Sequence, residues 1–564
     1  MSLYNDASLA MIPSAVKDGK LYSIRPTDGS GDFTFSRGSN LAATRVDVNG
    51  LIEKGRENLL LQSNQFDTTW TLDNASVTSG QSGYDGSSDA WLLQATASTS
   101  TARLKQVVSL TGVHTTSIYA KAGSTDWIAI QMWSNHFAYF DVANGVVGNS
   151  GSAIDASIEA AGNGFYRCSI SYNASSVGNL WVYVIDGNGS TSVTSGKNVY
   201  LQSAQLEVGL VATDYIESTT TTAVSGITED LPRLDYSGGA SCPSLLLEPT
   251  RTNLMPQSEV INLWVAKVGV TIETNTTETL SPEGLYNATK LTATHTDPNI
   301  YQPINVTADP HTMSFYVKGV GNSIGKVGRI LFWYIGTATG TTTSHNFTLN
   351  GDWQRIEATT TPTGAGSLFF RIDVPADNSV VGDEAYIYGV QVEQGSYPSS
   401  YIPTYGSAVT RSKDAMNEQI SSLTSIEQGT FFLDFDRGLT NGTARDGNTD
   451  GFFYRSGSSF PATNAIEIAT DVDGNVRAAI RMDGFLQLYL NDTLSRYKIL
   501  FKWSGTSVNV FVNGALVYDN PTRWTATLPL QYIGYHASFR KSVNQLLTFP
   551  TALTDSECIA LTAI

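Results

Sequence analysis

Aromatic side chains at alternate positions of one short segment are the group best suited to chemistry in this sequence. Residues 127–133 read WIAIQMW, an alternation typical of a half-buried strand. Successive side chains of a strand point to opposite faces, so Trp127, Gln131 and Trp133 share one face and the aliphatic residues the other. Flat aromatic rings beside a planar amide can stack on sugar rings and bond their hydroxyl groups. The segment therefore predicts a sugar-binding surface.

Three further segments carry the same kind of residues. Trp181 and Tyr183 share one face of a predicted strand, and Arg329 with Trp333, together with Arg371, form a similar group later in the chain. We expect these residues to be ligand-binding as well. The alternative is that the rings fill the second side of a sandwich or an interface between subunits, because exposed aromatic groups serve all three purposes.

One loop imitates the beginning of a calcium-binding loop. Asp446, Asn448 and Asp450 place oxygen atoms at alternate positions before a glycine. An EF-hand also needs a glutamate at its twelfth position, where this chain has Gly457. We therefore expect an ordinary Asx-rich loop and no cofactor, with calcium binding as the alternative interpretation.

The sequence shows no catalytic constellation, and we expect no enzyme. The histidines are isolated, without the spacing of a metal site, and neither a Gly-x-Ser-x-Gly elbow nor a phosphate-binding loop occurs. Paired carboxylates of a glycosidase meet only in the folded chain, so a polysaccharide-cleaving enzyme stays an alternative.

A phrase near the beginning of the chain occurs twice. RENLLLQS begins at Arg56 and RTNLMPQS begins at Arg251, which brings Asn58 and Asn253 to the same place in each copy. Later phrases repeat in the same order, including SIYAK at 117–121 with SFYVK at 314–318, and QLEVG at 205–209 with QVEQG at 391–395. A series of paired landmarks in one order indicates a duplicated module. We expect the repeated Arg and Asn residues to be structural, binding backbone carbonyl groups at the module entrance.

Three arginines stand at matching points between the modules. Arg45 precedes the first copy, Arg233 precedes the second and Arg411 follows it. We expect each of them to pair with an acid across a module junction and so to fix the angle between modules.

Composition and turn signals predict an all-β protein of tandem jelly-roll β-sandwiches followed by another sandwich. Fifty glycines and abundant aromatic residues favour tight turns and strands. We expect an N-terminal attachment arm at 1–50, or else an edge strand there. Module one at 51–217, a connector at 218–245, module two at 246–408 and a C-terminal sandwich at 415–564 follow. In the last, Asn513-Gly514 predicts a hairpin and TDSE at 554–557 predicts a helix cap.

Charge and targeting signals limit the partners. A net charge of −17 with scattered basic residues argues against nucleic acid as a partner. We find no secretory signal at residues 1–16 and no apolar run of about 18 residues, so we expect no membrane insertion. Three distant cysteines fit assembly in a reducing cytoplasm.

The repeated phrases resemble those of carbohydrate-binding-type jelly rolls in bacteriophage tail-fibre and virion-surface proteins. In that group Arg-x-Asn-Leu opens a module, and Gln-x-Glu-x-Gly followed by Tyr-Ile closes it, as at 205–209 and 215–216 here. The C-terminal hairpin, the YIG strand at 532–534 and the closing helix resemble a concanavalin A-like, laminin-G-type sandwich.

The resemblance implies a virion protein, assembled in the host cytoplasm, that acts as a tail fibre or receptor-binding adhesin. It implies host surface polysaccharide as one partner and other virion proteins, reached through the N-terminal arm, as another. We expect a homo-oligomer, with a trimer favoured, because several weak sites acting together raise the overall affinity. A head fibre, a decoration protein or a spacer without a receptor is the alternative.

Overall fold

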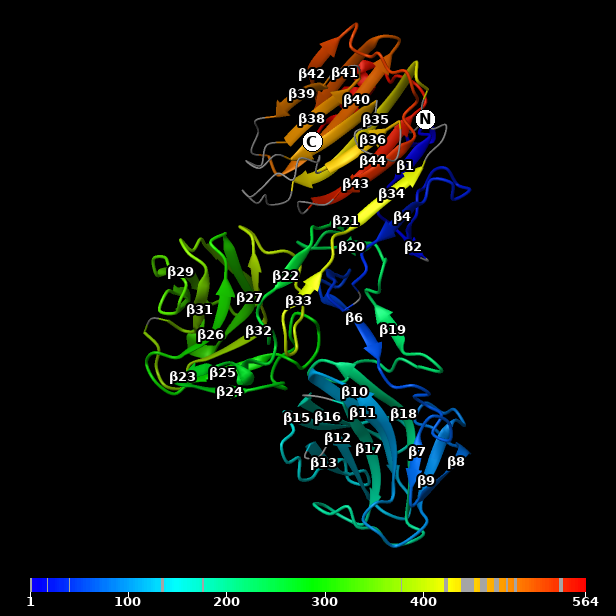
Figure 1. Cartoon of the computed structure of the whole chain (residues 1–564), viewed down its shortest axis with the longest axis vertical. Coiled ribbons are helices and arrows are strands. Elements are labelled where there is room, and N and C mark those ends of the chain that lie inside the picture. The colour runs from blue at the N-terminus through cyan, green and yellow to red at the C-terminus, as the bar shows by residue number, and fades with distance from the viewer. Residues whose placement is uncertain are drawn as a thin grey trace.

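The computed structural model describes residues 3–17, 19–39, 41–132, 136–174, 177–376, 378–419, 425–437, 451–456, 464–470, 476–482, 485–490, 494–536 and 541–564. Antiparallel strands dominate these residues, and they contain one α-helix, α1 (Asp555–Thr562), with the short 3-10 turns η1 (Leu3–Asn5), η2 (Ile261–Leu263) and η3 (Gly321–Ser323). The predicted all-β class is confirmed. Three sandwiches are visible in Figure 1.

Module one consists of two antiparallel sheets around one core. Its outer sheet has the order β14 (Val146–Val147), β13 (His136–Asp141), β12 (Trp127–Met132), β17 (Val177–Ile185), β10 (Arg103–Ser109) and β7 (Thr71–Asp73). Its inner sheet has the order β15 (Asp155–Ala160), β16 (Tyr166–Ala174), β11 (Gly112–Ala122), β18 (Asn198–Val208), β9 (Ala90–Ala95) and β8 (Ala75–Gln81). The chain crosses repeatedly between the sheets, and alternate apolar residues of both meet in the core.

Module two has the same plan. One sheet has the order β23 (Ala266–Val268), β26 (Asn299–Val306), β31 (Gly366–Asp373), β28 (Val327–Trp333) and β29 (Thr343–Thr348). The other has the order β24 (Val270–Glu273), β25 (Thr289–Ala293), β32 (Glu384–Gln394), β27 (His311–Val320) and β30 (Gln354–Thr360). Strands β11 and β27 take the same place beside β18 and β32. The pairing register shifts at Ser117/Tyr119 in one copy and at Ser314/Tyr316 in the other. Two modules with one strand order and one irregularity in common are what a duplication produces.

The third sandwich, which we call the base sandwich, is built from three distant parts of the chain. Its first sheet contains β20 (Arg233–Asp235), β21 (Ser244–Leu247), β44 (Lys541–Phe549), β35 (Gln428–Arg437), β40 (Arg496–Ser504), β41 (Ser507–Val512) and β42 (Ala515–Asn520), with β1 (Leu9–Met11) also on β44. Its second contains β2 (Val16–Lys17), β3 (Lys20–Leu21), β4 (Phe33–Ser36), β34 (Ala415–Gln419), β43 (Tyr532–His536), β36 (Gly451–Arg455), β37 (Ala465–Thr470), β38 (Val476–Arg481) and β39 (Phe485–Leu490).

The N-terminal segment is therefore not an attachment arm, and the sequence prediction for it is wrong. Leu9 and Met11 are fully buried in the core of the base sandwich, and β1 pairs with β44. The second interpretation, an edge strand on module one, is also wrong, because the strand joins the opposite end of the chain. The connector at 218–245 likewise supplies β20 and β21 to the base sandwich. Apolar residues in these segments remove surface from water by packing there.

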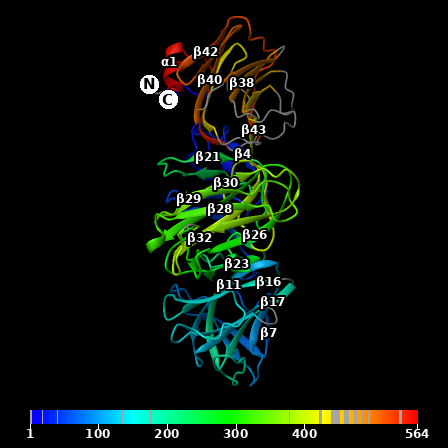
Figure 2. The ribbon, with the colours of Figure 1, turned by 90° about the vertical axis from the view of Figure 1, so that its left-hand side faces the viewer.

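The path of the chain makes the two modules insertions into the base sandwich. The chain begins in this sandwich, runs out to module one and returns at β20 and β21. It then runs out to module two and returns at β34. Figure 1 shows both termini at the base sandwich and module one farthest from it, and Figure 2 shows module two between these two from the side.

Two small ladders connect the modules to the base sandwich. The first joins β19 (Ala223–Gly226), β6 (Ile52–Asn58) and β5 (Thr44–Val46), and the second joins β22 (Arg251–Asn253) to β33 (Val409–Arg411). β6 opens module one and β22 opens module two, so the phrases that begin at Arg56 and Arg251 start in these ladders.

Local predictions for the C-terminal part hold. Asn513 has a positive φ in the turn that joins β41 to β42, as an Asn-Gly hairpin requires. Thr554 and Glu557 form a capping box at the beginning of α1.

Candidate functional site

The outer sheet of module one places most of its predicted ligand-binding residues on one face. In the pairing of β12 with β17, Gln131 lies opposite Trp181, and Trp127 lies opposite Ile185, two residues beyond Tyr183. Trp127 and Trp181 are partly exposed. The apolar residues on the opposite face of β12, Ile128, Ile130 and Met132, are buried in the core as predicted. Trp133 lies outside the described residues.

Polar contacts fix the centre of this face. The Tyr183 hydroxyl donates to Oε1 of Gln131 at 2.6 Å. Nη1 of Arg103 donates to the same hydroxyl at 2.5 Å, and its guanidinium lies 5.2 Å from the ring centroids of both Trp181 and Tyr183. Asp73 accepts from Nε of Arg103 at 3.0 Å. Burial raises the pKa of Tyr183, so its hydroxyl stays protonated at neutral pH.

Sequence reasoning missed the aromatic residues of the neighbouring strand. Phe137 and Tyr139 of β13 stack with centroids 6.0 Å apart, and Phe137 lies 6.2 Å from Tyr183. The segment HFAYFD at 136–141 alternates in the same way as β12, and this signal could have revealed them. We call the set Trp127, Phe137, Tyr139, Trp181 and Tyr183 the aromatic face of module one.

Module two has a matching face. Trp333 lies 5.9 Å from Tyr301 and 6.4 Å from Phe369 between ring centroids, and the Arg371 guanidinium lies 5.7 Å from the Trp333 ring. The predicted residues Arg329, Trp333 and Arg371 thus come together on β28 and β31. We call Tyr301, Trp333, Phe369 and Arg371 the aromatic face of module two.

A fully buried carboxylate orders the arginines of this face. Asp373 accepts from Nη2 of Arg329 at 2.6 Å and from Nε of Arg371 at 2.5 Å. Arg371 also pairs with the exposed Asp297 at 2.9 Å, and these partners raise its pKa although burial acts against them. Both guanidinium groups are thus held in place by carboxylates of the protein itself.

The two faces use equivalent positions but exchange residue types. Arg103 lies opposite Tyr183 across β10 and β17, and Tyr301 lies opposite Arg371 across the corresponding β26 and β31. Each module therefore has an arginine opposite a tyrosine at this place. The arginine lies on the first strand of the pair in module one and on the second strand in module two. Each outer face therefore combines partly exposed rings with a fixed guanidinium.

The repeated asparagines act as the sequence predicts. Asn58 accepts from the backbone of Leu60 and Leu206 and donates to the carbonyl groups of Ala204 and Ile216. Its counterpart Asn253 makes the same four contacts, to Met255, Val392, Val390 and Ile402. Both asparagines are fully buried. Each one closes its module by joining the opening strand to the closing segment.

Arg56 holds a carboxylate of the other module. Its guanidinium forms an ion pair with Glu283 of module two. Two residues earlier, Lys54 enters the same module, with Nζ 2.6 Å from Glu259 and 2.7 Å from Glu283. Sequence reasoning missed Lys54, because a lone lysine in a strand carries no signal of burial.

Tyrosine rings complete the surroundings of Lys54. Its ammonium lies 5.3, 5.5 and 5.8 Å from the rings of Tyr388, Tyr401 and Tyr405. Burial lowers the pKa of Lys54 to about 8, while Glu259 opposes that shift, and the lysine stays protonated at neutral pH. Module one is thus anchored in module two by a buried ion pair.

The connector arginines form a second buried cluster, as predicted for two of the three. Arg233 pairs with Glu248 at 2.8 Å and with Asp414, and Arg411 pairs with Glu248 at 3.0 Å. Arg37 joins the cluster through Asp414 at 3.3 Å. This network ties the base sandwich to module two.

Arg45 does not act in this way. It pairs with Glu53 at 2.7 Å within its own hairpin of β5 and β6, so the prediction of a pair across a junction is wrong for it. The pairing of β5 with β6 places Arg45 directly opposite Glu53, where an ion pair forms within the hairpin.

The candidate calcium residues Asp446, Asn448 and Asp450 lie outside the described residues. Within the residues that are described, no group of three or more His, Cys, Asp or Glu side chains could hold a metal ion. The same part of the chain contains no helix with the length and hydropathy needed to cross a membrane.

Comparison with known proteins identifies no relative by sequence. No protein-family model and no curated protein matches this chain. Among solved structures, the tandem CBM22 domain of Xyn10C from Paenibacillus barcinonensis is 14% identical, covers 62% of this chain and 98% of its own, and has a TM-score of 0.19. The tandem CBM51 modules of Sp3GH98 from Streptococcus pneumoniae are 11% identical, cover 64% and 97%, and have a TM-score of 0.18.

A solved structure of a single module is also similar to part of this chain. The CBM6 module of lichenase 5A from Cellvibrio mixtus, solved with cellotriose, is 13% identical, covers 27% of this chain and 99% of its own, and has a TM-score of 0.17. All three TM-scores lie well below 0.5, so these similarities carry no conclusion about ligand or function. The class of the protein follows from its own structure: an all-β chain with two duplicated sandwich modules inserted in a third sandwich.

Proposed function

We propose that the chain is a multivalent glycan-binding protein that binds sugars on the aromatic faces of modules one and two. The observation that supports this most is that both aromatic faces combine partly exposed rings with a fixed guanidinium, which belongs to an arginine–tyrosine pair at equivalent strand positions. Rings offer stacking area for the C–H face of a sugar, while Arg103 and Arg371 can donate to hydroxyl groups. The face is therefore built for a polar ligand with a flat apolar side.

We further propose that the chain is a phage tail fibre or receptor-binding adhesin that recognises host surface polysaccharide, which the resemblance of the repeated phrases to virion-surface proteins supports. We propose a concanavalin A-like type for the base sandwich, a homo-oligomeric assembly, and attachment without a catalytic step. Two faces per chain and several chains per particle would raise a weak affinity by multivalency.

Alanine substitution in the faces tests the proposal. We expect the purified chain to bind a subset of a bacterial glycan array, and we expect Trp181→Ala with Trp333→Ala to lower that affinity at least tenfold. Tyr489→Ala, which removes an exposed ring from the base sandwich, is the matched control and should leave binding unchanged. A chain that binds no glycan, or a double variant that binds as well as the parent, contradicts the proposal and favours a spacer without a receptor.

A further inference from the structure

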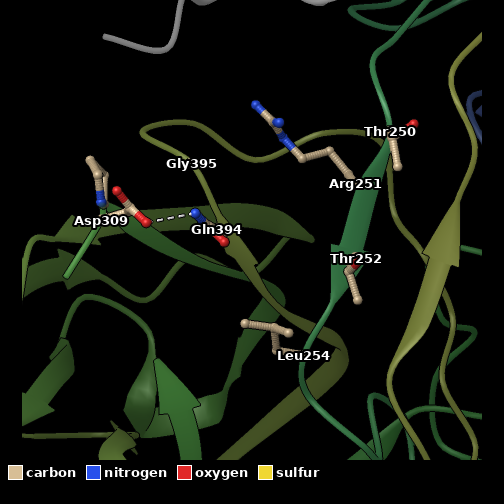
Figure 3. A pocket seen from close by; sticks show the side chains of 8 residues that line it. Thr250, Arg251, Thr252, Leu254, Asp309, Gln394 and Gly395 are labelled. Carbon is tan, nitrogen blue, oxygen red and sulfur yellow. Dashed lines mark hydrogen bonds between the residues drawn. The ribbon is translucent and has the colours of Figure 1, made fainter. Parts of the chain in front are cut away.

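A polar cavity lies at the entrance of module two, away from both aromatic faces. Its volume is about 310 Å³, within the range of small-ligand sites. Figure 3 shows Arg251 on the opening strand β22, with Asp309 and Gln394 across from it. The lining residues are Thr250, Arg251, Thr252, Leu254, Asp309, Pro310, Gln394 and Gly395. Most of these side chains are polar, as expected of a site for a hydroxyl-rich ligand.

The guanidinium of Arg251 has unused donors beside the cavity that its side chain lines. It lies 5.0 Å from the ring centroid of the buried Tyr397. Its Nε and Nη2 atoms have no hydrogen-bond partner in the part of the chain that the structure describes. Both atoms are covered from solvent, so a carboxylate in the cavity contacts them once the side chain turns toward it. Buried donors without a partner are rare because each one costs free energy. Two adjacent N–H groups of an arginine match the two oxygens of a carboxylate.

Module one shows what the same position does when it is occupied. Arg56 is the counterpart of Arg251, and it holds the carboxylate of Glu283. The cavity beside Arg56 is walled by residues of the closing segment of module two, including Pro403 and Tyr405. Within one chain, the first copy of this arginine therefore binds a carboxylate supplied by a neighbouring module.

A further module is a poor occupant for the cavity of module two. The junction around Arg56 also depends on Lys54, whose ammonium forms an ion pair with Glu259 of the adjoining module. The matching position before Arg251 is Pro249, which has no ammonium to insert. A smaller ligand that brings its own carboxylate satisfies Arg251 without that second anchor.

The opposite wall of the cavity favours a sugar over a simple anion. Asp309 accepts from Nε2 of Gln394 at 2.8 Å and from the hydroxyl of Thr307 at 2.8 Å. Its negative charge repels an ion that is anionic throughout, such as a polyphosphate. It accepts readily from hydroxyl groups, so a ligand with a carboxylate at one end and hydroxyls at the other matches both walls.

We propose that the cavity at Arg251 binds an acidic sugar residue of a polysaccharide, with the sugar carboxylate on Arg251 and its hydroxyl groups on Asp309 and Gln394. The inference rests on the proposed glycan binding and adds the chemical class of the ligand. It gives the chain a third contact with the polymer, beside the two aromatic faces.

Matched polysaccharides test this site in the full-length chain. The probes are acidic bacterial polysaccharides that the chain binds on an array, each compared with its carboxyl-reduced form. We expect Arg251→Gln to lower the affinity for the acidic form at least tenfold and to leave that for the reduced form within twofold. Arg25→Gln removes one charge from the base sandwich and should change neither affinity.

A second variant keeps the test decisive if Arg251→Gln does not fold. Asp309→Asn removes a repulsive charge while retaining an oxygen that can accept, so it should strengthen binding of the acidic form. Equal binding of acidic and reduced polymers by the parent, or equal effects of Arg251→Gln and Arg25→Gln, would overturn the inference. In either of these outcomes the glycan-binding function stands if Trp181→Ala with Trp333→Ala still lowers the affinity for the reduced polymer, and the acidic-sugar site alone fails. A parent chain that binds no polysaccharide on the array would overturn both.

Discussion

Single residues that recur in both modules divide into those that keep one role and those that change it. Asn58 and Asn253 make the same four backbone contacts, because the closure of each module depends on them. Arg56 and Arg251 stand at the same place, yet one is paired with Glu283 and the other faces a cavity. A role within the module is preserved by duplication, whereas a role toward a neighbour depends on which neighbour is present.

The asparagine contacts lead to a stability prediction. We expect Asn253→Ala to lower the free energy of unfolding of module two by about 3 kcal/mol, because it leaves several buried backbone groups without partners. Urea denaturation followed by tryptophan fluorescence measures this. Thr252→Ala, one position earlier, should cost far less, because the hydrogen bond between the Thr252 and Thr410 hydroxyls is exposed. Equal losses in the two variants would show that the asparagine contacts are unimportant.

Strands β11 and β27 hold equivalent places beside β18 and β32 and carry matching features. Each has the same irregularity in its register, and each begins near a buried histidine. His114 donates from Nδ1 to the Gly112 carbonyl at 3.1 Å, and His311 donates to the Asp309 carbonyl at 2.8 Å. Burial is the main cause that lowers the pKa of both histidines, so both stay neutral in the native state.

The two buried histidines predict that the stability of the protein depends on pH. The unfolded chain takes up protons on its histidines below about pH 6.5, while native His114 and His311 resist protonation. Because the unfolded state then binds more protons, the free energy of unfolding falls as the pH decreases below about 6.5. We expect the double variant His114→Gln with His311→Gln to lose less stability between pH 7.5 and 5.5 than the parent does.

Calorimetric scans at the two pH values provide the measurement. His345→Gln, a change of an exposed histidine on β29, controls for the removal of a histidine as such. A double variant with the same loss of stability as the parent would assign the acid sensitivity to other groups.

The whole molecule is held together at its junctions by buried polar contacts and by backbone hydrogen bonds between modules. Lys54 and Arg56 enter the acidic and tyrosine-rich region of module two, and Arg233 with Arg411 ties that module to the base sandwich. At the contact between modules, the amide of Val113 donates to the Tyr405 carbonyl at 2.6 Å. Buried charges of this kind are destabilising when one partner is removed, so the modules have a defined orientation.

Gly112 is the residue that permits the close approach. It has a φ of +90°, and a Cβ atom there would lie 1.9 Å from the Tyr405 carbonyl oxygen. We expect Gly112→Ala to separate module one from module two, which small-angle X-ray scattering would detect as a larger radius of gyration. Gly50→Ala is the matched control, because Gly50 has a φ of +80° with nothing within 4 Å of the added atom. It should show the cost of a positive φ, about 1 kcal/mol, without a change in shape. The same radius for parent and Gly112→Ala would contradict this account of the junction.

Short-range and repeated patterns were readable from the sequence. Alternation placed Trp127 and Gln131 on one face, the Asn-Gly pair predicted the turn at Asn513, and the capping residues predicted the beginning of α1. The duplicated phrases located the asparagines that close each module. These features depend on neighbouring residues or on a comparison of the chain with itself, so side-chain chemistry and spacing were enough.

The tertiary structure alone decided which distant segments meet. In the sequence, Leu9 and Met11 belong to a short apolar segment with no sign of its partner. The structure shows that this segment pairs with β44 and is buried in the base sandwich. Lys54 became an anchor, and Arg251 a candidate site, through the surroundings that other parts of the chain supply. Strands pair through backbone groups that every residue possesses, so the choice of a distant partner leaves little trace in residue type. The β character of the segments was therefore readable locally, while the insertion of both modules into one sandwich was fixed by long-range packing.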